Sequence, residues 1–414
     1  MLNKNNEREL AYITRIEEIK EIPNYDKVEY ARIGAGWWVI VRKNQFKVND
    51  LCIYFEVDSK VPEKEPFLFL EKRNYKIKTI KMCGVISQGL IMSAEDFGWV
   101  IDDADGSIIV PPEKFGSTKV YHEGDFLTKE LGVIYADEKD NVRKNNFNKY
   151  KDIENKHKKI FSNKFIKCMM KYKWFRNFIY NLFTKKKNRK YDWPYWVKKT
   201  DEERVQNLPY LFPDNKDVWI ATEKIDGTST TFTIKNNHKK DYYVCSRNVC
   251  FSNRENKDCY YDTNVYLEMS EKYDMKNKML SMIKYLENNR GYDDRRKLEY
   301  LTIQGETYGG NIQKRNYGKE HRLAIFNIIF KYKDEEEIRL NPYSGKVFAN
   351  MFDLPFVPVL GEYHLPKTCE ELLNIATGES KIDGGMREGL VFRTKDGKQS
   401  FKAVSNEFLL KYHG

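Results

Sequence analysis

The sequence predicts an α+β protein of several domains, in which a small β-barrel domain precedes a larger domain that mixes helices and strands. Its 414 residues exceed the usual size of one domain and leave room for two or three. Short strand-like runs fill the region before residue 139, whereas strand-like and helix-like stretches alternate from residue 196 onward. We therefore expect domains at residues 1–138 and 196–414, joined by a basic, partly helical linker at residues 139–195.

The first domain is predicted from short apolar runs separated by turn residues. Residues 37–41 and 51–55 are such runs, and Gly, Asn or Asp bounds each of them. Regularly spaced short strands with glycines at the bends suit a barrel of the oligonucleotide-binding (OB) kind better than a sandwich. Periodicity alone does not decide between these two folds.

The linker carries most of the positive charge. The chain has a net charge of +11, and the segment from 141 to 199 holds about nineteen Lys and Arg against three acidic residues. Apolar residues recur there at helical spacing, at Phe161, Phe165, Met169, Tyr172, Phe175, Ile179 and Leu182. The cations could bind phosphates of a nucleic acid, through Lys185, Lys186, Lys187, Arg189 and Lys190. Two alternatives are a solvated face and, less favoured, binding to an anionic membrane.

Several classes of protein are disfavoured. We find no apolar stretch long enough to span a membrane and no apolar signal core at the start, so we expect an intracellular protein without stable membrane association. The seven cysteines form no C-x-x-C pair, and the six histidines do not fall beside them at zinc-ligand spacing. We expect reduced, mostly buried thiols and no structural zinc.

The larger domain contains one clear helical pattern, at residues 268–288, and one stretch that suggests chemistry. An apolar run at residues 218–223 leads into Lys224, and an Asp226-Gly227 turn follows. A lysine attacks phosphorus only as a neutral amine, so this use predicts a part-buried pocket rich in cations. Taken alone, Lys-x-Asp-Gly is a weak signal, because Asp-Gly turns are common in hairpins.

Six short motifs in order strengthen the interpretation. The sequence resembles the covalent nucleotidyltransferase superfamily of ligases and capping enzymes at KIDG (224–227), SRN (246–248), GETYG (305–309), AIFNI (324–328), EGLVFR (388–393) and FKAV (401–404). The resemblance implies a two-sheet, ATP-grasp-like transferase domain.

Further matches favour the RNA-ligase branch of this superfamily. Thr222-Glu223-Lys224 together with SRN resembles the RNA ligase 2 group. FEVDSKVP (55–62), GVISQGL (84–90) and KTDEERVQN (199–207) look like the Naegleria-type RNA ligases, which place an OB domain ahead of the transferase. DNA ligases and capping enzymes carry that domain after the last motif, whereas only about a dozen residues follow Lys402.

The resemblance also implies roles for particular residues. Lys224 would carry covalent AMP and Glu388 would contact the metal; the nucleotide would be bound by Glu223 (adenine edge), Glu306 (ribose), Phe326 (base stacking), and Arg204, Arg247 and Lys402 (phosphates). The implied cofactors are ATP and Mg²⁺ or Mn²⁺. Structural alternatives remain, because Phe326 could be plain core and Glu388 could cap a strand turn.

The last motif departs from the family pattern. Related ligases usually carry two lysines at alternate positions there, and Ser400 stands where the first would be. Neutralisation of the α-phosphate would then depend on Lys398, on Lys402 or on a second Mg²⁺.

These observations predict an ATP-dependent RNA ligase that joins 3′-hydroxyl and 5′-phosphate ends through lysyl-AMP, on nicked duplex RNA and as a monomer. Two alternatives remain open. The same lysine chemistry with GTP would make an mRNA-capping guanylyltransferase, and a decayed transferase scaffold would make a non-catalytic RNA-binding protein.

Overall fold

A computed structural model provides the fold of the chain. It describes residues 9–102, 106–112, 117–136, 158–163, 193–200, 202–212, 215–251, 263–289, 297–313 and 315–413, and seven isolated positions at 166, 169, 170, 172, 175, 179 and 261.

The first domain is built on a five-stranded sheet in the order β3-β2-β1-β4-β8. Its strands are β1 (Ala11–Glu21), β2 (Val28–Ile33), β3 (Trp37–Arg42), β4 (Leu51–Phe55) and β8 (Leu90–Met92). The expected apolar runs thus form β3 and β4. Long β1 pairs with β2 through its second half and with β4 through its first half, so the sheet bends around this strand.

The sheet nearly closes into a barrel, as expected for an OB fold. Gln88 N donates to Trp38 O at 2.8 Å and Ile40 N donates to Ser87 Oγ at 3.0 Å, which joins β3 to the segment ahead of β8. Smaller sheets complete the domain and comprise β5 (Ser59–Lys60) with β12 (Ile134–Tyr135), β6 (Ile80–Met82) with β7 (Val85–Ser87), and β9 (Val100–Ile101), β10 (Ile108–Val110) and β11 (Lys119–Tyr121).

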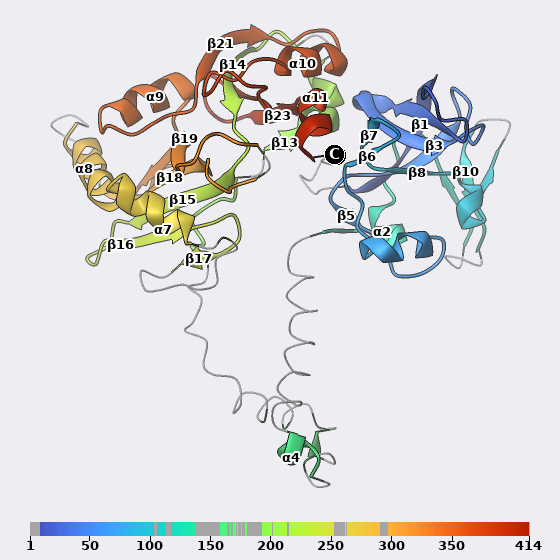
Figure 1. The fold of residues 1–414 in the computed structure, drawn as a ribbon, viewed down its shortest axis with the longest axis horizontal. Coiled ribbons are helices and arrows are strands. Elements are labelled where there is room, and N and C mark those ends of the chain that lie inside the picture. The colour runs from blue at the N-terminus through green and yellow to red at the C-terminus, as the bar shows by residue number, and fades with distance from the viewer. Residues whose placement is uncertain are drawn as a thin grey trace.

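The second domain contains two sheets (Figure 1), which confirms the expected α+β class. One has the order β13-β23-β22-β14-β21 and comprises β13 (Glu203–Arg204), β14 (Val218–Lys224), β21 (Val359–His364), β22 (Gly389–Thr394) and β23 (Ser400–Val404). The other has the order β17-β16-β15-β18-β19-β20 and comprises β15 (Thr228–Lys235), β16 (Asp241–Cys245), β17 (Cys250–Phe251), β18 (Leu298–Tyr308), β19 (Arg322–Tyr332) and β20 (Glu337–Arg339).

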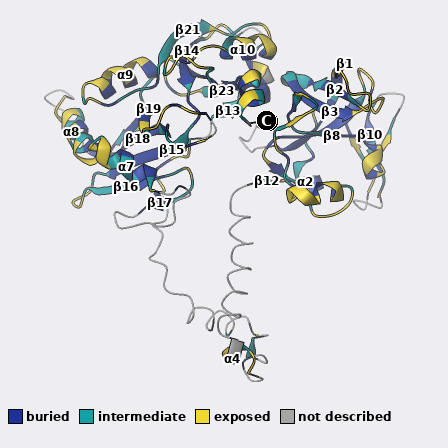
Figure 2. Cartoon of the chain, viewed as in Figure 1, coloured by how far each residue is buried: buried dark blue, intermediate teal, exposed yellow. Residues whose placement is uncertain are grey.

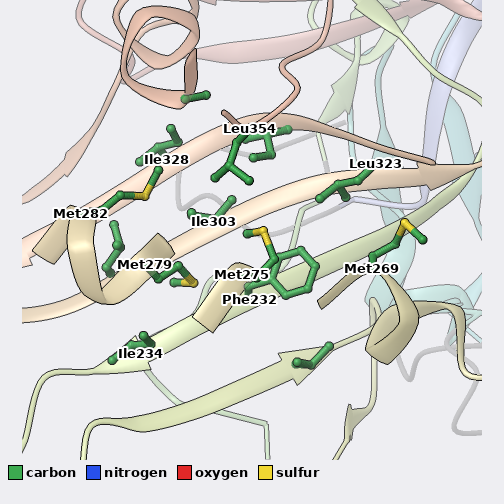
Figure 3. Packing of buried hydrophobic residues seen from close by; sticks show 14 of the residues in the cluster. Phe232, Ile234, Met269, Met275, Met279, Met282, Ile303, Leu323, Ile328 and Leu354 are labelled. Atoms are coloured by element: carbon green, nitrogen blue, oxygen red, sulfur yellow. The ribbon is translucent and has the colours of Figure 1, made fainter. Parts of the chain in front are cut away.

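Helices cover one face of each sheet. Helices α7 (Val265–Lys272), α8 (Met275–Asn288) and α9 (Pro342–Asn350) pack on the six-stranded sheet, and α10 (Cys369–Ala376) packs on the five-stranded one. Met275, Met279 and Met282 of α8 lie against Phe232 and its neighbours (Figure 3). Burial follows this arrangement, because α8 and α9 turn an exposed side away from the strands (Figure 2).

The expectation of one helix over residues 268–288 is wrong. The chain forms α7 and α8, which are separated at Tyr273 and Asp274. Asp274 has a left-handed backbone with φ of 48°, which ends the first helix and redirects the second. Both helices still bury methionines in the same core, so the apolar spacing continues across the break.

The two domains touch beside the C-terminal segment, which comprises α11 (Asn406–Phe408) and the turn η6 (Leu409–His413) (Figure 1). Ile86 of the barrel packs with Val404 and Leu409, and Lys81 Nζ donates to Leu410 O at 3.1 Å. Asn207 Nδ2 donates to Glu56 Oε2 at 3.4 Å within the same contact. The barrel is therefore anchored to the sheet that carries Lys224.

Most of the basic linker, including Lys185, Lys186, Lys187, Arg189 and Lys190, lies outside the described residues. Helix α4 (Lys158–Phe161) is described within it, and the longer amphipathic helix stays a prediction. The expected domain boundaries at 138 and 196 also stay predictions, because the described strands do not fix them. In the part of the chain that is described, every helix is too short or too polar to cross a membrane.

Candidate active site

Lys224 is the last residue of β14, an inner strand of the five-stranded sheet between β22 and β21. Antiparallel pairing with β22 sets Lys224 opposite Gly389, and Glu388 directly precedes that residue. Strand pairing therefore brings together two residues that are 164 positions apart in the sequence.

The lysine ammonium is bound by the Glu388 carboxylate. Lys224 Nζ lies 2.6 Å from Oε1 and 2.7 Å from Oε2, so one ammonium donates to both oxygens. The Lys224 side chain is 25% exposed and that of Glu388 is 11% exposed. The pair is thus largely shielded from water while one side of the lysine stays open to a ligand.

Two motif glycines permit this close arrangement of strands. A Cβ on Gly227 would lie 2.3 Å from Thr307 O on β18, and one on Gly389 would lie 2.2 Å from Ala403 O on β23. Real side chains do not approach a carbonyl so closely, and a backbone atom cannot step aside as a flexible side chain can. The glycines that follow Asp226 and Glu388 are therefore required by packing.

Carboxylates dominate the electrostatics around the lysine. Burial lowers the pKa of Lys224, but Glu388, Glu306 and Asp226 together outweigh burial and hold it above its ordinary value. Burial raises the pKa of Glu306 to about 8; Lys224 opposes this rise, whereas Glu388 and Asp226 add to it.

The part-buried position expected for Lys224 is confirmed, but the expected cation-rich surroundings are wrong. The groups that act most strongly on its charge are carboxylates, so the ammonium is the stable form in the absence of ligand. Attack on phosphorus therefore requires that the Lys224–Glu388 pair first open.

A segment that the sequence motifs do not include supports the turn after Lys224. Tyr317 Oη accepts from Asp226 N at 3.2 Å, and Gln313 Nε2 donates to Gly227 O at 3.0 Å. The Arg315 guanidinium lies 4.2 Å from the Tyr317 ring centroid and pairs with Asp383. These contacts span about 70 to 90 residues, and no local pattern indicates them.

Glu223 is buried beside the nucleophile, and its carboxylate faces the loop that precedes β22. It accepts from Ser380 Oγ and, at 2.7 Å, from Lys381 N. A carboxylate can accept about four hydrogen bonds, so capacity remains for a base amino group. The adenine contact stays a prediction, and the structure adds Ser380 as a residue that orients this carboxylate.

Phe326 on β19 belongs to an apolar cluster next to the lysine. The cluster contains Ile225, Tyr308 and Tyr317 as buried members, whereas Phe326 and Ile382 are only partly buried. Phe326 is therefore not fully covered by its neighbours, and its stacking on a base stays a prediction.

Two of the predicted phosphate contacts lie side by side. Arg204 on β13 is opposite Lys402 on β23, and Lys402 is in turn opposite Val391 on β22. Among the described residues, none accepts a hydrogen bond from the buried Arg204 Nη1. A buried donor without an acceptor destabilises the fold unless a ligand supplies the acceptor. Arg247 lies apart at the tip between β16 and β17, with Nη2 3.5 Å from Tyr135 Oη of the barrel domain.

Ser400 explains how the last motif departs from the family pattern. Its hydroxyl donates to Glu202, whose other oxygen accepts from the buried Arg393 at 3.0 Å. Arg393 is the cross-strand partner of Ser400, so a cation already lies beside the position where related ligases carry the first lysine. Lys398 is exposed in the hairpin turn, at the far end of β22 and β23 from Glu388, so it does not join the site.

The carboxylates fit a divalent cation only with help from a ligand. In the part of the chain described here, no three His, Cys, Asp or Glu side chains are grouped closely enough to hold a metal by themselves. Mg²⁺ commonly binds one or two carboxylates and fills its other positions with water and phosphate oxygens. Glu388 supplies such a hard oxygen donor beside Lys224, so the residues fit a metal that also binds phosphate.

Comparison with known proteins agrees with this geometry. A model of the RNA ligase family matches residues 217–413, and a model of an OB-fold domain matches residues 10–94. A search of curated protein sequences gave no match.

Solved structures of an RNA ligase from Naegleria gruberi are similar to nearly the whole chain. The structure with pyrophosphate is 25% identical over 98% of this chain and 99% of that chain, with a TM-score of 0.60. A variant with ATP and manganese is 25% identical over 98% of this chain and 100% of that chain, with a TM-score of 0.62. These matches show an OB-fold domain at residues 10–94 ahead of a region, residues 217–413, that matches the RNA ligase family, and the Naegleria ligase is similar over nearly the whole chain.

Proposed function

We propose that this protein is an ATP-dependent RNA ligase that acts as a monomer and seals 3′-hydroxyl and 5′-phosphate ends on nicked duplex RNA. The observation that carries the proposal is the single ammonium of Lys224 at a strand end, bound by Glu388 and close to Glu306. The similar Naegleria ligase structures contain ATP, manganese or pyrophosphate, which supports ATP and a divalent metal as cofactors here.

In the first step Lys224 forms a covalent bond to AMP. Its Nζ, after loss of a proton, attacks the α-phosphorus of ATP, the bond to pyrophosphate breaks, and a phosphoramidate results. The proton must leave before attack, so the contact of 2.6 Å to Glu388 opens as ATP enters. A divalent cation bound by Glu388 and the phosphates would neutralise the charge that develops on them.

The remaining site residues orient the nucleotide. Phe326 stacks on the base and Glu223 accepts from its edge. Glu306, with a pKa of about 8, binds the ribose hydroxyl. Arg204 offers its unpaired Nη1 to a phosphate oxygen, and Lys402 lies beside it.

In the second and third steps AMP passes to the RNA 5′-phosphate, and the RNA 3′-hydroxyl then displaces AMP to seal the strand. Both are in-line phosphoryl transfers that need the RNA ends held beside Lys224. Arg247 bridges toward Tyr135 of the barrel, which supports a role for both domains in holding the duplex. The cations of the basic linker would add contacts to RNA phosphates.

Labelling with each α-³²P nucleotide and Mg²⁺ tests the first step. We expect an acid-labile, alkali-stable adduct from ATP and none from GTP, because Glu223 reads the adenine edge. Lys224→Ala and Lys224→Arg should both abolish the adduct, since neither supplies a neutral amine. Preferential labelling by GTP would favour a capping enzyme, and no labelling at all would favour a non-catalytic RNA-binding protein.

Sealing on a panel of RNA substrates tests the later steps. We expect joining to be most efficient on a nicked RNA duplex and slower on open single-stranded ends. A protein that forms lysyl-AMP but seals none of these substrates would contradict the ligase assignment and leave only the adenylylation step.

A further inference from the structure

Residues 193–200, which we name the strap, lie along one face of the six-stranded sheet. Trp196 Nε1 is 3.0 Å from Thr233 Oγ1, and Thr200 Oγ1 is 2.7 Å from Ser229 Oγ. Gln304 on β18 also donates to a strap carbonyl, Lys198 O, at 2.8 Å. The strap therefore follows β15 from its end toward its beginning.

This is the face that carries Glu306. Side chains alternate along β15, and Phe232 and Ile234 point into the core beneath α7 and α8. Ser229 and Thr233, which contact the strap, lie on the other face, and Ser229 is the cross-strand partner of Glu306. Lys235 lies six residues beyond Ser229, or roughly 20 Å at the rise of an extended strand.

An exposed aromatic ring is fixed at that far end of the strap. Tyr195 is 81% exposed and packs edge-on against Trp196, with ring centroids 5.1 Å apart. Lys235 Nζ lies 4.6 Å from the Tyr195 centroid and 4.8 Å from that of Trp196, and it also donates to Tyr195 Oη. The ring is thus held in place while most of its surface faces solvent.

The surroundings of the ring are cationic. Lys199 Nζ lies 5.8 Å from the Trp193 centroid and donates to Asn248 Oδ1 at 2.7 Å, which connects the strap to the SRN motif. The neighbouring acid, Glu337, is paired with Lys198 at 2.8 Å. Fixed aromatic rings beside lysines are the usual way in which proteins bind nucleic acid strands without reading their sequence.

A role in packing alone does not account for this arrangement. A ring that stabilises the fold by packing is covered by its neighbours, whereas Tyr195 leaves four-fifths of its surface open. Trp196 already fills the space against the sheet, through Thr233 and through Tyr243 at a centroid distance of 5.7 Å.

We propose that Tyr195, held by Lys235 and Trp196, is a stacking platform for an unpaired base of the RNA strand whose end reacts beside Lys224, where that strand continues beyond the duplex. The platform lies roughly 20 Å from Glu306 along β15, which corresponds to about six nucleotides at the stacked spacing of roughly 3.4 Å. This inference rests on the proposed RNA ligase function and adds to it a contact remote from the chemistry.

Binding measurements with Tyr195→Ala and a matched control test the platform. The control is Tyr210→Ala, because Tyr210 is also highly exposed, at 69%, but belongs to the separate turn η5 (Pro209–Leu211). We expect Tyr195→Ala to weaken binding of a nicked RNA duplex, with the joined strand left unpaired from about six nucleotides beyond the nick, about 5- to 100-fold. Tyr195→Phe, which keeps the ring, should stay within about threefold of the unaltered protein, and Lys224 adenylylation in each variant reports whether the pocket is folded.

The salt dependence separates stacking from charge. Tyr195→Ala removes no cation, so the slope of log affinity against log salt should match that of the unaltered protein. A second readout scans 2-aminopurine through the RNA strand, and we expect its fluorescence to be quenched most strongly about six nucleotides from the joined end. That quenching should disappear in Tyr195→Ala.

The results distinguish a failure of the stacking platform from a failure of the proposed RNA ligase function. If the unaltered protein seals RNA but Tyr195→Ala binds as tightly, or Tyr210→Ala loses as much affinity, the platform is wrong and the ligase function stands. If the unaltered protein forms no lysyl-AMP or seals no RNA, the proposed function fails and the platform with it.

Discussion

Glu306 has a carboxyl group whose charge changes within the pH range of ordinary assays. Its pKa of about 8 in the folded protein lies well above the value near 4.3 expected in an unfolded chain. Between these values the folded state binds more protons than the unfolded state, so stability falls as pH rises from about 4.5 to 8.

Glu306→Gln should remove this pH dependence. The variant should gain stability relative to the unaltered protein by up to about 1.4 kcal/mol per pH unit between pH 5 and 8, and the gain should level off above pH 8. Urea unfolding at several pH values measures the difference. A difference that does not change with pH would mean that the carboxyl titrates normally.

Tyr317 supports the turn after the nucleophile by one hydrogen bond to Asp226 N. Tyr317→Phe leaves this buried N–H unpaired, which should lower stability by about 1–3 kcal/mol and slow lysyl-AMP formation. Tyr308→Phe is the control, because Tyr308 packs edge-on against Tyr317 in the same cluster. Equal effects of both changes would show that losing any tyrosine hydroxyl in this cluster has the same cost, so that the bond to Asp226 has no special role.

The sequence predicts only part of this residue-level picture. Its motifs indicate Lys224, Glu306 and Glu388, and the structure brings all three together. No sequence pattern indicates Tyr317 and Gln313, because they act through backbone contacts to a turn about 90 positions earlier. The carboxylate-rich surroundings of Lys224 likewise depend on pairing between distant strands, which local patterns do not reveal.

At the scale of elements, the close approach of the turn after β14 to β18 depends on Gly227. Gly227→Ala would place a methyl group 2.3 Å from Thr307 O, so we expect a loss of about 1–3 kcal/mol and a marked loss of adenylylation. Gly34→Ala is the control, since its methyl group would lie 3.3 Å from a Thr14 hydroxyl. Thermal unfolding compares the two, and a tolerated Gly227→Ala would contradict the packing argument.

The sequence predicts the bounds of a strand best where one short apolar run coincides with that strand. Strand β4 spans residues 51–55 as expected, because every residue of that run is buried. The pattern at 268–288 correctly predicts helical structure but predicts one helix where the chain forms two. The apolar spacing persists across Asp274, although the backbone turns there. Periodicity reports which side chains face the core and does not report where the chain bends.

At the scale of the whole molecule, the charge of the linker predicts that RNA binding and lysyl-AMP formation depend on different parts of the chain. Changing Lys185, Lys186, Lys187, Arg189 and Lys190 to Gln should weaken RNA binding and reduce its salt slope by up to about 0.9 per lost duplex contact. Lysyl-AMP formation should persist, because the proposed ATP site is formed by the motif residues and not by the linker.

Both activities are measured in the same variant across a salt series. An unchanged affinity and slope would mean that the linker is a solvated connection. Loss of adenylylation in a folded variant would instead assign these cations to the ATP site.

The Glu202 bridge between Arg393 and Ser400 bears on how substitutions among related ligases should be interpreted. A lysine at position 400, as in relatives with two motif lysines, would set an ammonium across from a buried guanidinium, where like charges repel. Ser400→Lys should therefore be harmful alone and tolerated when Arg393 is neutral, so the two positions are epistatic. A change at position 400 is therefore expected to require a matching change at position 393.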